Sequence, residues 1–173
     1  MTESDMDLSP SSKFPSFESP LERYYQRLYC SKLRLYVHRH SNGILVLGLA
    51  PGHPCRADEL KRPVFIQFDD QLTSTAVSGK RKHGSQLAVA GKTRICFVTC
   101  KDGSIEEILA PIKGSVIEIN RRLEQSPHLL SELPDSDGWL AILMPKKGGS
   151  LQLQNETEYG TAFGIENIES VLK

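Results

Sequence analysis

Short runs of alternating apolar and polar residues fill most of the chain between residues 33 and 144, a pattern typical of β-strands that bury one face. Asn42-Gly43 and Asp102-Gly103 each separate two such runs and favour tight hairpin turns, because these residues accept positive φ angles. The expected strands flank Ser41-Asn42-Gly43 and cover Val64–Phe68, Ser85–Gly91, Thr93–Cys100, Ser104–Leu109, Ser115–Ile119 and Trp139–Met144. Many short strands with few helices predict a small, mainly β barrel or sandwich.

The two ends of the chain differ from this central region. Residues 1–18 are dominated by Ser, Pro and acidic groups without periodicity, which predicts a disordered tail. Ser19-Pro20 then fits a helix N-cap followed by a first-turn proline. Large side chains follow at helical spacing, at Leu21, Tyr24, Tyr25 and Leu28. We therefore expect a short N-terminal helix, a domain over 19–147, and a C-terminal extension over 148–173 that is partly helical or disordered.

The charges of the chain balance, with 21 basic and 21 acidic side chains, so recognition by charge depends on local clusters. The strongest cluster lies between Gly79 and Gly84 and consists of Lys80, Arg81, Lys82 and His83, which we call the basic turn. It is the candidate partner-binding site, because it would attract an acidic partner such as actin, RNA or inositide phosphates. The alternative is a solvated loop that keeps a strand edge from aggregating.

Aromatic residues bear on which partner is expected. A protein interface concentrates its energy in a few buried anchors, and Tyr24, Tyr25 and Tyr29 could supply them, although their helical spacing is more typical of a packed core. Binding of RNA would call for aromatics interleaved with the basic turn. None lies between Phe68 and Phe97, so the sequence supports nucleic-acid binding weakly.

The chain lacks the common motifs of catalysis and metal binding. No Gly-x-Ser-x-Gly, phosphate-loop or dinucleotide pattern occurs. His38 and His40 share one strand face without a third ligand nearby, and Cys96 and Cys100 share a face with Val98 as small buried side chains would. We predict no enzyme activity, no cofactor and no metal. No apolar run reaches the about 20 residues that span a bilayer, so no membrane span is expected.

Residues 110–143, APIKGSVIEINRRLEQSPHLLSELPDSDGWLAIL, resemble the distal half of the glycine cleavage H-protein, a biotinyl/lipoyl-like barrel built on the single hybrid motif. The matching positions are Pro111, Gly114, Glu118, Asn120, Ser126, Pro127, Leu129, Gly138, Trp139 and Leu140. The resemblance implies an H-protein-like barrel. In it, Pro111 and Gly114 would break strand pairing, Asn120 would accept a left-handed turn, and Trp139 would fill the core.

Carrier function in that family depends on a lysine at the exposed tip of a hairpin. The corresponding position here, eight residues before Pro111, is Gly103. The nearest lysine, Lys101, lies two positions earlier beside an Asp-Gly turn and lacks the flanking residues of a lipoylated lysine. We therefore expect a barrel without its carrier lysine, with lipoylation of Lys101 as the alternative.

A second resemblance covers more of the chain, from Leu21 to Lys147. The segments LERYYQRLY, HSNGILVLGLAPGHP, VSGKRKHGSQ, GSVIEIN and GWLAILMPK follow the order and spacing of the Abitram (Simiate) family, described as actin-binding transcription modulators. This implies association with actin, an influence on filament assembly, filopodia and other cell projections, and residence in nuclear speckles and cytoplasm. It implies no catalysis. A nuclear RNA- or chromatin-associated adaptor that uses the basic turn is a further alternative, and self-association is left open.

Overall fold

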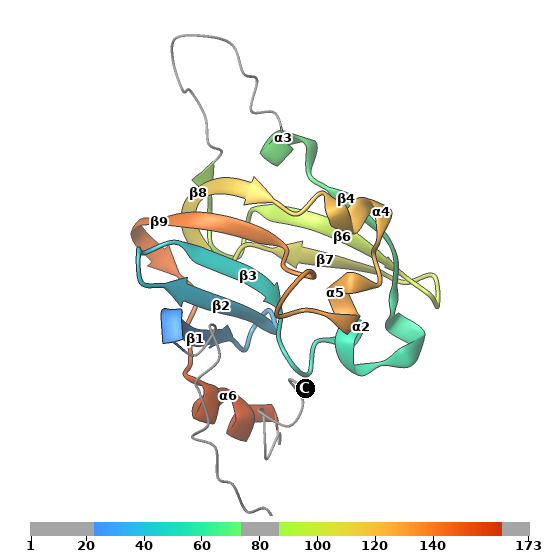
Figure 1. Ribbon diagram of the computed structural model, residues 1–173, viewed down its shortest axis with the longest axis horizontal. Coiled ribbons are helices and arrows are strands. Elements are labelled where there is room, and N and C mark those ends of the chain that lie inside the picture. Colours follow the sequence, from blue (N-terminus) through green and yellow to red (C-terminus); the bar gives the residue numbers. More distant parts are fainter. Residues whose placement is uncertain (1–22, 74–86, 164–173) are drawn as a thin grey trace, which may run out of the picture.

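Two antiparallel sheets dominate the computed structural model, which describes residues 23–73 and 87–163 (Figure 1). The larger sheet has six strands in the order β1-β2-β3-β9-β8-β5, and the smaller has three in the order β4-β6-β7. The larger sheet contains β1 (Tyr25–Cys30), β2 (Leu35–His40), β3 (Leu45–Leu49), β5 (Leu87–Ala88), β8 (Ile112–Ile119) and β9 (Ala141–Ser150). The smaller sheet contains β4 (Pro63–Phe68), β6 (Arg94–Cys100) and β7 (Ile105–Leu109). The mainly β class expected from the sequence is confirmed.

The helices of the described residues are short. They are α2 (Pro54–Ala57), the 3-10 turn η1 (Glu59–Lys61), α3 (Asp70–Thr73), α4 (Arg122–Gln125), α5 (Leu129–Glu132) and α6 (Glu156–Phe163). No described helix has the length and apolar character needed to cross a bilayer. The predicted tail at 1–18, the basic turn and the end of the chain from residue 164 lie outside the described residues.

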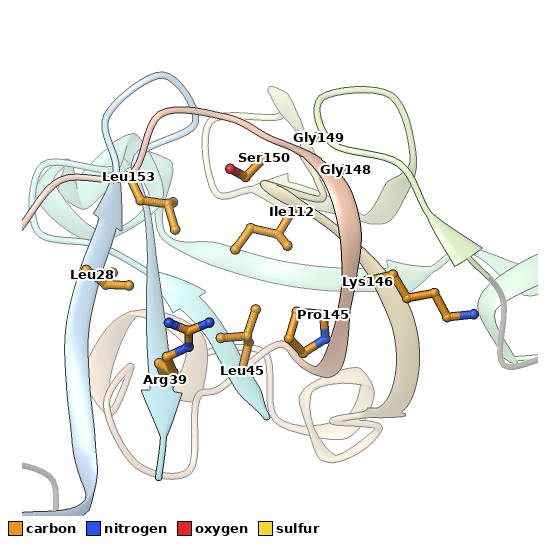
Figure 2. A pocket seen from close by; sticks show the side chains of 10 residues that line it. All are labelled: Leu28, Arg39, Leu45, Ile112, Pro145, Lys146, Gly148, Gly149, Ser150 and Leu153. Carbon is orange, nitrogen blue, oxygen red and sulfur yellow. The ribbon is translucent and has the colours of Figure 1, made fainter. Parts of the chain in front are cut away.

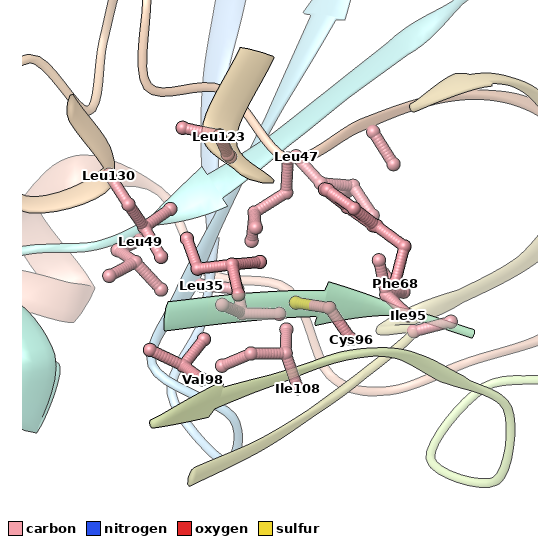
Figure 3. Close-up of a cluster of buried hydrophobic side chains, with 14 of the residues drawn as sticks. Leu35, Leu47, Leu49, Phe68, Ile95, Cys96, Val98, Ile108, Leu123 and Leu130 are labelled. Atoms are coloured by element: carbon pink, nitrogen blue, oxygen red, sulfur yellow. The ribbon is translucent and has the colours of Figure 1, made fainter. Parts of the chain in front are cut away.

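Apolar side chains on the inner faces of the two sheets form one core (Figure 3). Leu35 and Leu47 come from the larger sheet, and Ile95 comes from the smaller. Cys96, Val98 and Cys100 are all buried on one face of β6, as predicted from their spacing. Burial raises the pKa of the Cys96 thiol, which keeps it protonated and unreactive.

Most of the expected strands form where the pattern places them. The β2–β3 and β6–β7 turns use Gly43 at φ +93° and Gly103 at φ +84°, which confirms both hairpin predictions. The strand predicted over 85–91 is described only from residue 87, where β5 covers Leu87–Ala88 and ends before Val89. The chain turns directly after it, because the N–H groups of Lys92 and Thr93 both donate to the Val89 carbonyl.

The predicted N-terminal helix ends earlier than expected. Arg23 and Tyr24 are helical, but the residues from Tyr25 to Cys30 form strand β1. This strand pairs with β2 along its whole length, from Tyr25 opposite His40 to Cys30 opposite Leu35. A spacing of four residues, as from Tyr25 to Tyr29, places two side chains on one face of a helix and equally on one face of a strand, and pairing with an existing strand decides between the two.

The glycines of the H-protein-like motif lie where backbones approach too closely for a side chain. A Cβ atom at Gly138 would overlap the Leu129 carbonyl oxygen, and one at Gly114 would lie 2.6 Å from the Met144 carbonyl oxygen. Pro111 lies between β7 and β8, where strand pairing was expected to break. The close approaches explain why the motif has glycine at positions 114 and 138.

Two expectations about the motif are wrong. Asn120 does not adopt a left-handed conformation; its side-chain amide instead donates to the carbonyls of Asp137 and Trp139, at 2.7 and 2.8 Å. Asn120 thereby ties the end of β8 to the segment that leads into β9. Trp139 is only half-buried and lines surface hollows instead of filling the core. The adjacent Leu140, which is fully buried, takes the core position instead.

Replacing Asn120 with alanine is expected to destabilise the fold by about 1–3 kcal/mol, because two carbonyl groups at a nearly buried site lose their donor. The measurement is the free energy of unfolding in urea. Glu118→Ala, at an exposed position on the same strand, is the matched control and should change it little. Equal effects of the two substitutions would contradict the bridging role of Asn120.

Candidate functional site

The β6–β7 hairpin tip is a glycine turn at the position where the resemblance to the H-protein would place a carrier lysine. Gly103 has a φ angle of +84°, which a lysine rarely adopts. The Gly103 N–H donates to the Cys100 carbonyl, and the Asp102 carboxylate accepts from the N–H and hydroxyl of Ser104. These hydrogen bonds lower the pKa of Asp102. Gly103 is thus the residue type that the backbone conformation of this turn favours.

The same tip is held against the chain that precedes β4. The Lys101 N–H donates to the Arg62 carbonyl and the Asp102 N–H to the Leu60 carbonyl, both at 2.9 Å. Lys61 and Glu106 form an ion pair at 2.8 Å beside them. Lys101 is exposed, but these hydrogen bonds fasten its backbone to the segment from Leu60 to Arg62.

Aromatic rings cover the outer face of β1 and β2, opposite the core. Because side chains alternate across a strand, Tyr25 and Tyr29 of β1 point to the same side as Tyr36, His38 and His40 of β2. The rings of Tyr36 and His38 stack with their centroids 4.0 Å apart. Tyr25 meets the edge of His40 at 4.9 Å. The strands therefore carry a continuous aromatic layer, which the helix expected around Tyr24 and Tyr25 did not predict.

Helix α6 covers one end of this layer and leaves the other open. Tyr159 of α6 stacks on Tyr29 with centroids 4.8 Å apart, and its hydroxyl donates to the Pro51 carbonyl at 2.6 Å. Tyr29 is consequently buried, whereas Tyr24 is 52% exposed and both Tyr25 and His40 are partly exposed. We call Tyr24, Tyr25 and His40 the aromatic edge.

Tyr36 and Gly48 give the layer a rigid floor. They lie opposite each other on β2 and β3, and a Cβ atom at position 48 would overlap the tyrosine ring. The Tyr36 hydroxyl donates to the Pro134 carbonyl, so the ring is fixed at both ends. Burial raises the pKa of Tyr36, which keeps this hydroxyl protonated.

His38 behaves as a neutral aromatic ring in this layer. It is 3% exposed, and burial, with a smaller contribution from Arg27, lowers its pKa to about 3. Its Nε2 atom has no hydrogen-bond partner within the described residues. Nearby, Asp135 pairs with Arg56 at 3.8 Å, and burial raises the pKa of that carboxyl. The layer therefore presents rings to a ligand, while the charges beside it are largely compensated.

Two shallow hollows meet at Tyr25. One is lined by Tyr24, Tyr25, Arg39, His40 and the β2–β3 turn. The other has a volume of about 240 Å³ and is lined by Tyr25, Tyr36, His38, Val46, Asp135, Ser136, Trp139 and Ile142. Half-buried tyrosine and tryptophan side chains beside hollows are the residues in which protein interfaces concentrate their binding energy.

The predicted site residues have different outcomes. Lys80, Arg81, Lys82 and His83 lie outside the described residues, so the basic turn stays a prediction. Of the three predicted anchors, Tyr29 belongs to the core, while Tyr24 and Tyr25 are accessible. His38 and His40 share the outer face as predicted, and no group of three potential metal ligands gathers in the described part of the chain. The alternating tyrosines and histidines were a detectable signal for the aromatic layer, but a helical interpretation of residues 21–28 concealed it.

Comparisons with known proteins agree with this geometry. The family model described as Glycine cleavage H-protein matches residues 27–164. The crystal structure of a glycine cleavage system H protein from Mycobacterium marinum superposes with a TM-score of 0.60 at 19% identity, covering 80% of this chain and 97% of that one. The H-protein-like fold expected from the sequence is thereby confirmed.

Relatives named Protein Abitram resemble the chain more closely in sequence. The protein from Dictyostelium discoideum is 33% identical over 134 residues, covering 72% of this chain and 74% of its own length. The one from Danio rerio is 31% identical over 137 residues, covering 74% and 77%, and the one from Homo sapiens is 27% identical over 150 residues, covering 82% of each. The chain therefore belongs to the Abitram family, within the wider glycine cleavage H-protein family.

Acid should destabilise the protein through its buried histidines. Burial lowers the pKa of His38 to about 3 and that of His53 to about 4, from 6.5. As the pH falls below about 6.5, the unfolded chain binds protons that the folded chain does not. The free energy of unfolding should therefore fall by up to about 1.4 kcal/mol per pH unit for each histidine. This loss starts near pH 6.5 and ends near pH 3 for His38 and near pH 4 for His53.

The measurement is urea unfolding at about pH 7, 6 and 5. His38→Phe should reduce the slope of stability against pH by about half, because it removes one of the two buried groups and keeps a ring in the stack. His128→Phe, at an exposed position, is the control and should retain the full slope. An unchanged slope in His38→Phe would show that His38 is protonated alike in both states.

Lys101 should not accept a lipoyl group. Incubation of the purified protein with lipoate, ATP and a lipoyl ligase is expected to leave its intact mass unchanged, while a glycine cleavage H-protein in the same reaction gains the group. The first reason is the glycine turn at Gly103. The second is the hydrogen bond from the Lys101 N–H to the Arg62 carbonyl, which fixes the backbone of the lysine. A mass increase that Lys101→Arg abolishes would instead establish the carrier alternative.

Proposed function

We propose that this protein is a non-enzymatic actin-binding module in which the H-protein-like barrel serves as a scaffold. The observation that carries the proposal is the aromatic edge, a set of accessible rings on a rigid sheet in a chain of the Abitram family. The expectation of actin binding comes from the resemblance to that family. The glycine turn at the carrier position supports a scaffold over a carrier.

The aromatic edge has the properties of an interface anchor. Tyr24 and Tyr25 each present a large ring at low conformational cost, because neighbouring rings restrict them, with centroids 6.4 Å apart for Tyr24 and His40. Backbone pairing holds the edge in place, since the Ser41 N–H donates to the Tyr24 carbonyl at 3.1 Å. A partner would bury these rings without large rearrangement of the sheet.

The basic turn would add long-range attraction to an acidic partner. Lys80, Arg81, Lys82 and His83 lie in sequence between α3 and β5. Charges at an interface rim mainly raise the rate of association and its sensitivity to salt, whereas buried rings determine how long a complex lasts. In this proposal the basic turn steers actin and the aromatic edge retains it. Modulation of filament assembly, action in cell projections and transcription, and residence in nuclear speckles and cytoplasm would follow from that contact.

Co-sedimentation with filaments, together with a monomeric-actin binding assay, tests the proposal at low and physiological salt. The wild-type protein should bind, and Tyr24→Ala should weaken binding about tenfold or more, because hot-spot rings contribute at least about 2 kcal/mol. Phe65→Ala is the matched control, since Phe65 is an equally exposed ring, 53% against 52%, on the other sheet. Failure of the wild-type protein to bind either form of actin would remove the proposal.

The basic turn is tested separately in the same assay. Replacing Lys80, Arg81 and Lys82 together with alanine should reduce binding most at low salt, where charge attraction is least screened. The control replaces the exposed Arg121 and Arg122 of the α4 region with alanine. Equal losses in both variants would mean that overall charge, and not the basic turn, governs association.

A further inference from the structure

A further hollow, separate from the two at Tyr25, lies at the mouth of the sandwich. It is on the core side of β2 and β3, beside the turn that joins them (Figure 2). It has a volume of about 240 Å³. The β6–β7 hairpin, which contains the carrier position, projects from the other end of the domain (Figure 1). This mouth cavity is therefore separate from the position at which an H-protein attaches its arm.

The floor of the mouth cavity is apolar and continuous with the core. Leu45 and Ile112 line it and are 2% and 8% exposed. Leu28 and Leu153 close its sides and pack against the same core cluster. Figure 2 shows these side chains, with Pro145, gathered around the opening. An aliphatic chain bound there would remove its own apolar surface and that of the cavity from water.

One charged group reaches over this floor. Arg39 belongs to the side of β2 that carries Leu35 and Val37 into the core, and its guanidinium group points toward Leu45 and the opening (Figure 2). No ion pair of the described residues includes Arg39, and no acidic residue lines the cavity. An unpaired guanidinium beside leucines is the chemistry that recognises a carboxylate through two parallel hydrogen bonds.

An irregularity in the β8–β9 ladder opens the cavity. Ile112 pairs with Ser150 and Gly114 with Pro145, so that residues 146–149 of β9 oppose the single residue Lys113. Gly148 and Gly149 make this bulge with φ angles of +93° and +74°. A regular ladder would draw β9 over the opening, and bulges of this kind commonly border functional sites.

The bulge also adds positive charge to the rim. Lys146 lines the opening, although its side chain points away from the floor in Figure 2. The ammonium group of Lys113 lies 3.8 Å from where a Cβ atom of Gly148 would be. The local field therefore favours an anion, while the floor excludes a fully hydrated one.

We propose that the mouth cavity binds a small carboxylic acid with an unbranched aliphatic tail. The carboxylate accepts hydrogen bonds from the Arg39 guanidinium, and the tail lies along Leu45 and Ile112. This ligand site is distinct from any covalent carrier function. It lies beside the proposed actin contact, because Arg39 also lines the hollow at the aromatic edge. It assigns to Arg39 a role that no feature of the sequence had indicated.

The test is titration of the full-length protein with decanoate, followed by calorimetry and by chemical shifts of the backbone amides. Decanoate should bind saturably and shift the amides of residues 39, 45, 112 and 146–150. Acetate tests the charged head without the tail, and decylamine tests the tail with the opposite charge. Neither should bind in the same concentration range, because each lacks one of the two required contacts.

Arg39→Gln should weaken decanoate binding about tenfold or more, since a charge-assisted bidentate contact is lost. The control is Arg122→Gln, on exposed helix α4. Leu153→Ala shortens one side wall and should weaken decanoate more than it weakens the shorter hexanoate, which distinguishes a tail contact from a folding defect. Thermal unfolding of each variant checks that it is folded.

Three results would overturn the proposal. One is the absence of saturable decanoate binding by the wild-type protein. Another is equal binding of decylamine, which would indicate unspecific apolar contact. The last is unchanged affinity in folded Arg39→Gln. None of them would affect the actin proposal, because the co-sedimentation variants leave Arg39 and the mouth cavity intact.

Discussion

The pairing of β1 with β2 is the interaction on which both proposed recognition surfaces depend. Its register turns Tyr25 and His40 to the outer face, while Leu28 and Arg39 face the core side. A slip of one residue would exchange the two faces of the strand and remove both the aromatic edge and the wall of the mouth cavity. The stacking of Tyr159 on the outer side of β1 opposes such a slip, because it would have to break together with the ladder.

The same strand therefore serves two different kinds of chemistry. His40 presents a ring on the outer face, and its neighbour Arg39 reaches over the leucine floor of the mouth cavity. Adjacent residues of a strand point to opposite sides of a sheet, but the exposed Arg39 also lines the hollow beside His40. Tyr24 and Leu153 each line only one of the two hollows, so substitutions at these residues would separate the two proposed contacts.

The β6–β7 hairpin, where the resemblance to the H-protein would place a carrier lysine, carries a glycine turn instead. Gly103 and Asp102 build a turn that satisfies its own polar groups, and two backbone hydrogen bonds fasten the turn to the chain before β4. A swinging arm depends on a lysine that projects freely, and the fastening works against this. The fold is thereby available as a scaffold, whose exposed positions are free to acquire other contacts.

The sequence by itself determined the mainly β class, both glycine turns and the buried face of β6, because these depend on local backbone preference and on alternation along one strand. Resemblance to the H-protein also located Gly114 and Gly138, whose close backbone contacts tolerate no side chain. The sequence did not determine whether residues 25–28 continue a helix or form a strand, since a spacing of four residues puts two side chains on one face of either element. Only pairing with β2 decided it, and the aromatic edge and the orientation of Arg39 follow from that non-local contact. The roles of Asn120 and Trp139 likewise depended on which segments lie beside them in space, which no local pattern encodes.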